Sequence, residues 1–260
     1  MAQNRVRIAD VADSLGLSTA TVSKVIHGKT EKISDETVKR VQQELERSGY
    51  IPNMAGILLA RNNSRIIGVV VNDNEKYEGR VLEDGFVMSS LNALSHEVNE
   101  KGYFLMIKTT SDISEILVFA SMWNMDGLIL MGFCEADYEK LRNQMRISFV
   151  VYDGYFEKCS KVVNLVINHY DGGYQAGNIQ MGNTKDGKGI QILKDIQIIG
   201  FDDNLASRES NPALTTIHQE APLRAKTAIK CLEAMRDGAE CETEIVLPVE
   251  LIKRESTRKL

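Results

Sequence analysis

Residues 8–29 read IADVADSLGLSTATVSKVIHGK and carry the clearest structural pattern in the chain. Apolar side chains recur at helical spacing from Ile8 to Leu15, and Gly16 interrupts the pattern. Ser18 is suited to cap a second short helix, whose valines would point back toward the first helix. Two short helices around a glycine-containing turn are typical of a helix-turn-helix motif.

The packing of these two helices predicts which side chains face outward. We expect the small Ala12 where the helices cross most closely, and Val22 in the angle between them. The second helix would then present Thr19, Ala20 and Lys24 to the solvent. A short hydroxyl-bearing face with one long cation suits the major groove of DNA. The segment therefore predicts a DNA-reading surface, although two core helices of an ordinary small α domain would show the same spacing.

Charge is unevenly distributed along the 260 residues, which carry a formal net charge of −5. Residues 1–61 hold 9 Lys and Arg against 7 Asp and Glu, a net charge of +2, so the remaining 199 residues hold −7. A mildly basic head on an acidic body is typical of a DNA-reading module joined to a part that does not touch DNA. The length allows two domains, and the 43% apolar content supports a sizeable core.

Several function classes find no support in the sequence. The four cysteines lack metal-ligand spacing, and the four histidines have no acid and nucleophile at motif spacing, so we expect no metal site, no cofactor and no catalysis. Residues 182–189 (GNTKDGKG) lack the Ser or Thr of a phosphate-binding loop, and no apolar strand precedes them. With no signal peptide and no apolar run near 18 residues, we expect a cytoplasmic protein without membrane contact.

The rest of the chain predicts a third helix, a linker and an α/β body. Ser34 can cap a helix that ends near Gly49, which completes a helical head over residues 1–52, and residues 53–65 follow as a hinge helix or linker. Beyond it, apolar and helical segments alternate, which indicates an α/β layer structure with a parallel sheet. The strands are expected at 66–71, 103–107, 127–131, 147–152, 162–167, 195–201 and, more weakly, 245–252, and the helices at 82–101, 114–123, 136–145, from Tyr170, and at 222–236.

Four stretches resemble the lactose-repressor/galactose-repressor family of bacterial transcription regulators. They are residues 8–29, residues 34–53 ending in GYIPN, the strand opening IIGV at 66–69, and IIGFDD at 198–203 followed by PALTTI at 212–217. The resemblance implies a multidomain α + α/β fold with a three-helix head, a hinge helix and a periplasmic-binding-protein-like body. It also implies a homodimer that binds a pseudo-palindromic double-stranded DNA operator and is controlled by a small sugar-like effector.

The same resemblance assigns DNA contacts to individual residues. Base contacts are implied for Thr19, Ala20 and Lys24, and phosphate contacts for Ser18, Thr21, Ser23 and Asn53. In the family, two linker helices enter a widened minor groove and wedge a leucine pair into the central base step. Here that leucine is Leu59, with Ala60 beside it, although Leu59 could instead pack on the α/β body. Arg7 replaces the threonine that usually caps the first helix, at a cost of about 1 kcal/mol.

The effector half departs more strongly from the family. The first subdomain would comprise residues 66–168 and 246–260, and the second residues 169–245. Only 22 residues separate Gly177 from Gly200, whereas a βαβ unit takes more than about 30 residues. We therefore expect an internal deletion and an incomplete second subdomain. The family's glycine-histidine segment and its hydroxyl-gripping arginine have no counterpart.

A few polar residues after predicted strands remain as candidates for effector binding. They are Asp202, Asp153, Asn72 and Asp73. Carboxylates at the carboxyl ends of strands can each accept two sugar hydroxyls, although such residues also begin turns and cap helices. Trp123 and Phe156 could stack on a sugar ring, but core packing is the simpler role for both.

The sequence therefore predicts a dimeric DNA-binding transcriptional regulator, of the repressor type, with a small carbohydrate effector. Two alternatives remain open. One is a sugar-binding module whose DNA head is vestigial, and the other is a decayed regulator without effector control.

Overall fold

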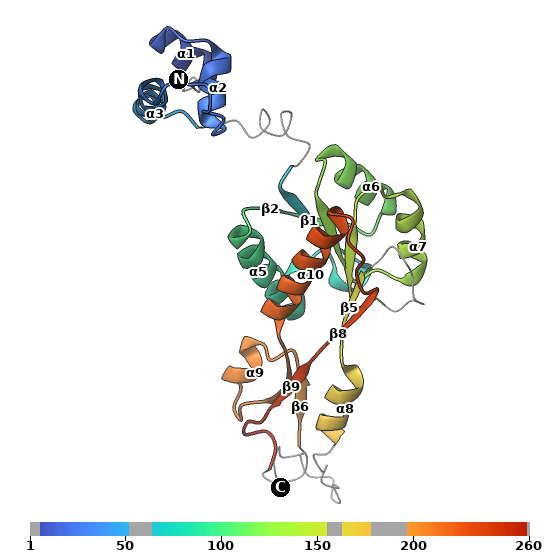
Figure 1. The fold of residues 1–260 in the computed structure, drawn as a ribbon. Helices are drawn as coiled ribbons and strands as arrows, with labels where there is room; N and C mark the ends of the chain where they lie inside the picture. Colours follow the sequence, from blue (N-terminus) through green and yellow to red (C-terminus); the bar gives the residue numbers. More distant parts are fainter. Residues whose placement is uncertain (1–5, 52–63, 155–162, 178–196, 259–260) are drawn as a thin grey trace, which may run out of the picture. The chain divides into compact units, whose positions relative to one another are not determined.

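The computed structural model describes residues 6–51, 64–154, 163–177 and 197–258. The chain divides into two compact units, Met1–Asn62 and Asn63–Leu260, which we call the head and the body (Figure 1).

Within residues 6–51 the head contains three helices, as predicted: α1 (Ile8–Leu15), α2 (Thr19–Ile26) and α3 (Asp35–Ser48). Ala12 and Val22 are 1% and 0% exposed, and they pack with Val11, Val25 and Val41 in one core. Gly16 ends α1 in the left-handed conformation (φ 66°), where a side chain would be strained. The expected burial of Ala12 and Val22 in one core is therefore confirmed.

Caps fix the ends of these helices. Ser34 accepts a hydrogen bond from the Thr37 N–H at 3.3 Å and so begins α3, as expected. Arg7 offers no side-chain cap to α1, but its own N–H donates to the Asp10 carboxylate at 2.8 Å. One of the two hydrogen bonds of a capping box, from the backbone of residue 7 to the side chain of Asp10, is therefore present at the start of α1 without the threonine.

The body is built on a sheet of six parallel strands in the order β2-β1-β3-β4-β5-β8. The strands are β1 (Ile66–Val71), β2 (Phe104–Thr109), β3 (Gly127–Met131), β4 (Phe149–Tyr152), β5 (Val163–Ile167) and β8 (Glu244–Leu247). All residues of β1, β3 and β4 are buried, which explains why these strands read as continuous apolar runs rather than alternating ones.

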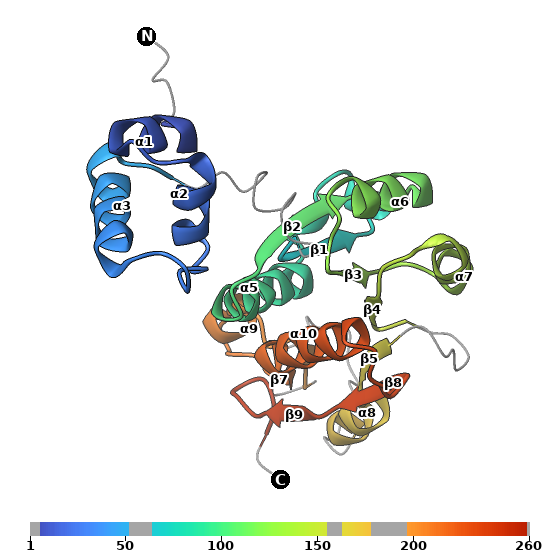
Figure 2. The ribbon, with the colours of Figure 1, turned by 45° about the horizontal axis from the view of Figure 1, so that its top comes forward.

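Helices cover both faces of this sheet. On one face, α5 (Gly85–Glu100) and α10 (Ala221–Arg236) pack side by side (Figure 2), and they share a core with the strands. On the other face, α6 (Ile113–Met122) and α7 (Glu135–Gln144) bury Ile116 and Leu141 against the sheet. Two short 3₁₀ helices, Glu75–Tyr77 and Val81–Glu83, precede α5. We call these six strands and their four covering α-helices the large-sheet lobe.

A second, three-stranded sheet has the order β6-β7-β9. In it β6 (Ile199–Phe201) runs parallel to β7 (Thr215–Gln219), and β9 (Val249–Ile252) runs antiparallel to β7. Two helices accompany it, α8 (His169–Gly177), which packs on β9, and α9 (Leu205–Glu209). This small-sheet lobe agrees with the expected incomplete second subdomain.

Among the described elements, the chain passes between the two lobes three times, after β5, after β7 and after β8. These crossings correct the expected division of the body. Helix α10 lies within 169–245 but packs on the large sheet, whereas β9 lies within 246–260 but pairs with β7 in the small sheet. The single weak strand expected at 245–252 is two strands separated by Pro248, one in each lobe.

Most other elements occur where the periodicity placed them, with shifts of a few residues at their ends. The sequence did not predict β7 or α9, and β6 is shorter than the run at 195–201 suggests. Among the described helices, none combines the length and the apolar character needed to cross a membrane.

Candidate functional site

The outward face of α2 is the candidate nucleic-acid interface. Ser18 accepts a hydrogen bond from the Thr21 N–H at 3.1 Å, which begins the helix with Thr19 in its first turn. Thr19, Ala20 and Lys24 are exposed, while Val22 on the opposite face is fully buried. The head core therefore leaves the predicted base-reading side chains free to enter a groove.

The expected phosphate-binding residues flank this face. Ser18 is exposed, and Thr21 and Ser23 are half-buried. The hydroxyls of Ser18 and Thr21 lie 2.9 Å apart, so one of them can donate to the other while the pair still accepts or donates outward. Asn53, Leu59 and Ala60 lie outside the described residues, and their DNA contacts stay predictions.

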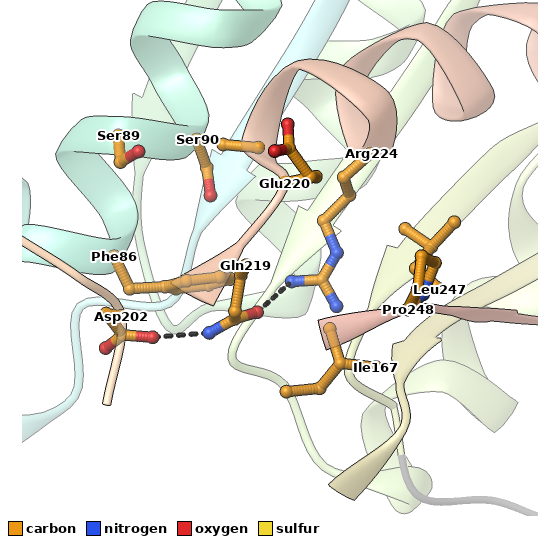
Figure 3. A pocket seen from close by; sticks show the side chains of 11 residues that line it. Phe86, Ser89, Ser90, Ile167, Asp202, Gln219, Glu220, Arg224, Leu247 and Pro248 are labelled. Atoms are coloured by element: carbon orange, nitrogen blue, oxygen red, sulfur yellow. Dashed lines mark hydrogen bonds between the residues drawn. The ribbon is translucent and has the colours of Figure 1, made fainter. Parts of the chain in front are cut away.

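A cavity between the two lobes is the candidate effector site. Its lining comes from α5, from the end of β6 and from all three crossings between the lobes: Phe86, Ser89, Ser90, Ile167, Asp202, Gln219, Glu220, Ala221, Arg224, Leu247 and Pro248 (Figure 3). Its free volume is only about 20 Å³. That is close to the room needed for one water molecule, so the cavity as it stands cannot hold a sugar.

Arg224 is a buried charge in the lining of this cavity. It lies in the first turn of α10 and is 3% exposed. Its Nη2 and Nη1 atoms donate to the two carboxylate oxygens of Asp153 at 2.6 and 3.0 Å, and Nη2 also donates to the Leu165 carbonyl at 3.2 Å. The guanidinium lies 4.9 Å from the centre of the Tyr152 ring and 5.4 Å from that of Phe86. Bidentate pairing and aromatic contact together offset the cost of burying this charge.

Gln219 connects this ion pair to the small-sheet lobe. Its Oε1 accepts a hydrogen bond from Arg224 Nη1 at 3.4 Å, and its Nε2 donates to Asp202 Oδ1 (Figure 3). Burial raises the pKa of the Asp202 carboxyl, the hydrogen bond from Gln219 opposes that rise, and the neighbouring charges of Asp84 and Asp153 reinforce it. A continuous series of hydrogen bonds therefore connects Asp153 to Asp202 through Arg224 and Gln219.

Of the four predicted effector residues, only Asp202 lines the cavity, and Asp153 is connected to it through its ion pair with the lining residue Arg224. Asp153 follows β4 with φ 52°, and Asp202 follows β6 with φ 78°, so both lie at the carboxyl ends of strands, as expected. Asn72 and Asp73 follow β1 and do not line the cavity. The Asn72 amide donates to the Gly132 carbonyl at 2.8 Å, which gives it a structural role beside β3.

Sequence reasoning missed Arg224 and Gln219. A signal existed for Arg224, because it shares a helical stripe with Ala228 and Leu232, both of which are apolar and buried. A cation on an apolar stripe indicates a buried partner. Gln219 gave no such signal.

The two aromatic residues considered for stacking on a sugar do not line the cavity within the described residues. Trp123 follows α6 and is not among the lining residues, and Phe156 lies outside the described residues. Within the described ranges no cluster of metal-ligating side chains occurs.

Comparison with known proteins assigns the chain to a family. The model of bacterial regulatory proteins of the lacI family matches residues 7–53, and that of the periplasmic binding protein-like domain matches residues 186–257. The maltose regulon regulatory protein MalI of Vibrio furnissii is 34% identical over 116 residues, which cover 44% of this chain and 77% of MalI. The chain belongs to the lacI family.

Other members of the lacI family are longer than this chain. The regulator MalR of Streptococcus pneumoniae is 34% identical over 136 residues, or 51% of this chain and 40% of that protein. MalR of Clostridium butyricum is 21% identical over 341 positions that cover 96% of this chain and 99% of MalR. Because that alignment is longer than the 260 residues of this chain, MalR contains segments that have no counterpart here.

Solved structures agree with the fold. A Lac repressor dimer bound to operator and the anti-inducer ONPF has a TM-score of 0.82 at 19% identity, over 98% of this chain and 99% of that one. A complex of the transcriptional regulator CelR with cellobiose has a TM-score of 0.62 at 16% identity, over 97% of this chain and all of that one. At these identities the likeness concerns the architecture of the chain.

Proposed function

We propose that this protein is a sequence-specific DNA-binding repressor that acts in the cytoplasm as a homodimer on a pseudo-palindromic operator, without a catalytic step. The observation that carries the proposal is the exposed face of Thr19, Ala20 and Lys24 on a well-packed head in a member of the lacI family. The operator-bound Lac repressor dimer, which has a similar fold, supports it.

Each side chain of this face has a chemical role in the proposal. The methyl groups of Ala20 and Thr19 can contact a thymine methyl, and the Thr19 hydroxyl and Lys24 ammonium can donate to base acceptors. Ser18, Thr21 and Ser23 would bind phosphates on either side and fix the register of the helix. Two heads in a dimer read two half-sites, which doubles the contact area and requires a symmetric operator.

Selection of binding sites from random duplexes with the full chain tests the proposal. We expect enrichment of sequences with two inverted half-sites, and binding that weakens steeply as salt rises. Sedimentation of the protein with the selected duplex should give two chains per duplex. Equal affinity for the selected site and for random duplex at moderate salt would contradict the proposal.

Control by a small carbohydrate remains a prediction of the family resemblance. Asp153 and Asp202 are placed as hydroxyl acceptors at strand ends, and the CelR–cellobiose complex has a similar fold. Both carboxylates, however, already accept hydrogen bonds from side chains of this protein. A carbohydrate would therefore compete with those side chains for the same carboxylate oxygens.

A further inference from the structure

Two residues that line the cavity between the lobes, Arg224 and Gln219, donate hydrogen bonds of the kind that a polyhydroxyl ligand would donate. The guanidinium of Arg224 gives Asp153 two donors in parallel, and the amide of Gln219 gives Asp202 one donor. A sugar satisfies such carboxylates through pairs of hydroxyl groups. In this chain, two of its own side chains take the place of those hydroxyls.

Displacing Arg224 would be unfavourable. The guanidinium is enclosed by Asp153, the Leu165 carbonyl and the rings of Tyr152 and Phe86, and its side chain is 3% exposed. Breaking a buried ion pair by moving one partner leaves the other charge without compensation. A carbohydrate, which is neutral, cannot replace the lost charge. The ion pair therefore competes with carbohydrate binding at Asp153.

The lobes also meet next to this cavity. A Cβ atom built on Gly85, the first residue of α5, would lie 3.7 Å from Cβ of Asn204 in the small-sheet lobe. Asn204 follows Asp202 and Asp203 and caps α9. The large-sheet and small-sheet lobes are thus in contact at the mouth of the cavity while its free volume is about 20 Å³.

We propose that Arg224 and Gln219 are a built-in occupant of the effector site. The hydrogen bond from Arg224 of the large-sheet lobe to Gln219 of the small-sheet lobe keeps the lobes in this closed arrangement and makes operator binding independent of carbohydrates. The part of the inference that concerns the operator rests on the proposed function. The part that concerns the lobes does not.

A disulfide across the lobes measures closure directly. Gly85→Cys with Asn204→Cys places two thiols at a Cβ separation of 3.7 Å, within the range of about 3.5–4.5 Å that a disulfide needs. In the full chain, Cys134, Cys159 and Cys241 are first replaced by Ser. Cys231 is kept, since burial raises its pKa to about 11 and the thiol reacts slowly.

The initial rate of cross-linking is compared with and without maltose or cellobiose. We expect rapid cross-linking with no sugar present, and the same rate in its presence. Arg224→Met with Asp153→Asn removes the ion pair without leaving an unpaired charge, and should slow cross-linking by about tenfold or more. Arg236→Met is the matched control, because it removes an arginine from a carboxylate pair at the last turn of α10, outside the cavity and on the same helix as Arg224, and should leave the rate unchanged.

Two results would overturn the inference: cross-linking that requires a sugar, or a double variant that cross-links as fast as its parent. Fluorescence of Trp123, the single tryptophan, reports whether each variant folds. If the double variant is unfolded, Gln219→Met keeps the ion pair and should still slow cross-linking by about threefold. Because no DNA is present, a failure here leaves the DNA-binding proposal untouched, and a failure to select an operator leaves the cross-linking result untouched.

Discussion

Arg254 donates a hydrogen bond from its guanidinium to the carboxylate of Asp203, and thereby joins the segment after β9 to the end of β6. Arg208 of α9 donates to the same carboxylate at 2.9 Å, and the Asp203 N–H donates to the Thr216 hydroxyl at 3.2 Å. Asp203 therefore holds the small-sheet lobe together, while its neighbour Asp202 faces the cavity between the lobes.

This arrangement predicts a pH-dependent contribution to stability from Asp203. Burial alone would raise the pKa of its carboxyl, but the hydrogen bonds from Arg254 and Arg208 hold that pKa below its ordinary value. The stabilisation is therefore complete above the unfolded pKa of about 3.9 and is lost as the pH falls through the folded-state pKa. Asp203→Asn should lower the free energy of unfolding by about 3 kcal/mol at pH 7, and by less below about pH 4. Thermal unfolding followed by circular dichroism between pH 3 and 7 measures this difference.

Asp202→Asn is the control for that experiment. Burial raises the pKa of Asp202, so ionisation of this group opposes folding as the pH rises past the unfolded value. The variant should therefore lose much less stability at pH 7 than Asp203→Asn does. An equal loss in the two variants would contradict the assigned roles.

Truncation in the head core should unfold the DNA-reading unit alone. Val22 is 0% exposed, so Val22→Ala removes two buried methyl groups and should destabilise the head by about 2 kcal/mol. The single tryptophan, Trp123, lies in the body, so its fluorescence melting curve should stay the same while the helical signal of the head melts earlier. A shift of the Trp123 transition would show that the two units do not unfold independently.

Two neighbouring substitutions on α2 should separate base reading from phosphate binding. Lys24→Ala removes an exposed cation and should reduce the preference for the selected operator over a site altered at one base pair, by about 1–3 kcal/mol. Ser23→Ala should weaken binding to all sequences to the same degree. Competition binding with the two duplexes distinguishes these outcomes, and a uniform loss for Lys24→Ala would contradict a base contact.

Gly68 in β1 tests the close packing of the large sheet. A Cβ on Gly68 would come within 2.6 Å of both Leu128 Cδ1 and Met125 Sδ. Gly68→Ala should therefore destabilise the body by about 1–3 kcal/mol. Gly173→Ala, where a Cβ meets nothing within 4 Å, is the matched control and should leave the Trp123 melting curve unchanged.

The fold could be predicted where local pattern and tertiary environment agree. The run IIGVVV of β1 is apolar throughout because helices cover both faces of its sheet. The packing of the head could be predicted because Ala12 is small enough, and Val22 apolar enough, to be buried between its helices. The assignment of β8 and β9 to different sheets could not be read from the sequence, since both segments are short and weakly alternating. The sheet to which each strand belongs depends on the strand it pairs with, β5 for β8 and β7 for β9, and not on its own β propensity.

The candidate effector site was only partly predictable for a related reason. Asp153 and Asp202 could be found because each directly follows an apolar strand. The bond between Arg224 and Asp153 joins residues 71 positions apart, and no local pattern encodes such a pair. The sequence therefore identified the two carboxylates, but not the Arg224 and Gln219 side chains that donate hydrogen bonds to them.

The three crossings between the lobes determine where this protein tolerates a change in length. Helix α8 packs on β9, and β6 pairs with β7, so the stretch that joins α8 to β6 starts and finishes on the same lobe. A foreign domain, such as a fluorescent reporter, that is inserted between α8 and β6 would therefore be attached at both ends to the small-sheet lobe, and the three crossings between the described elements would keep their connections.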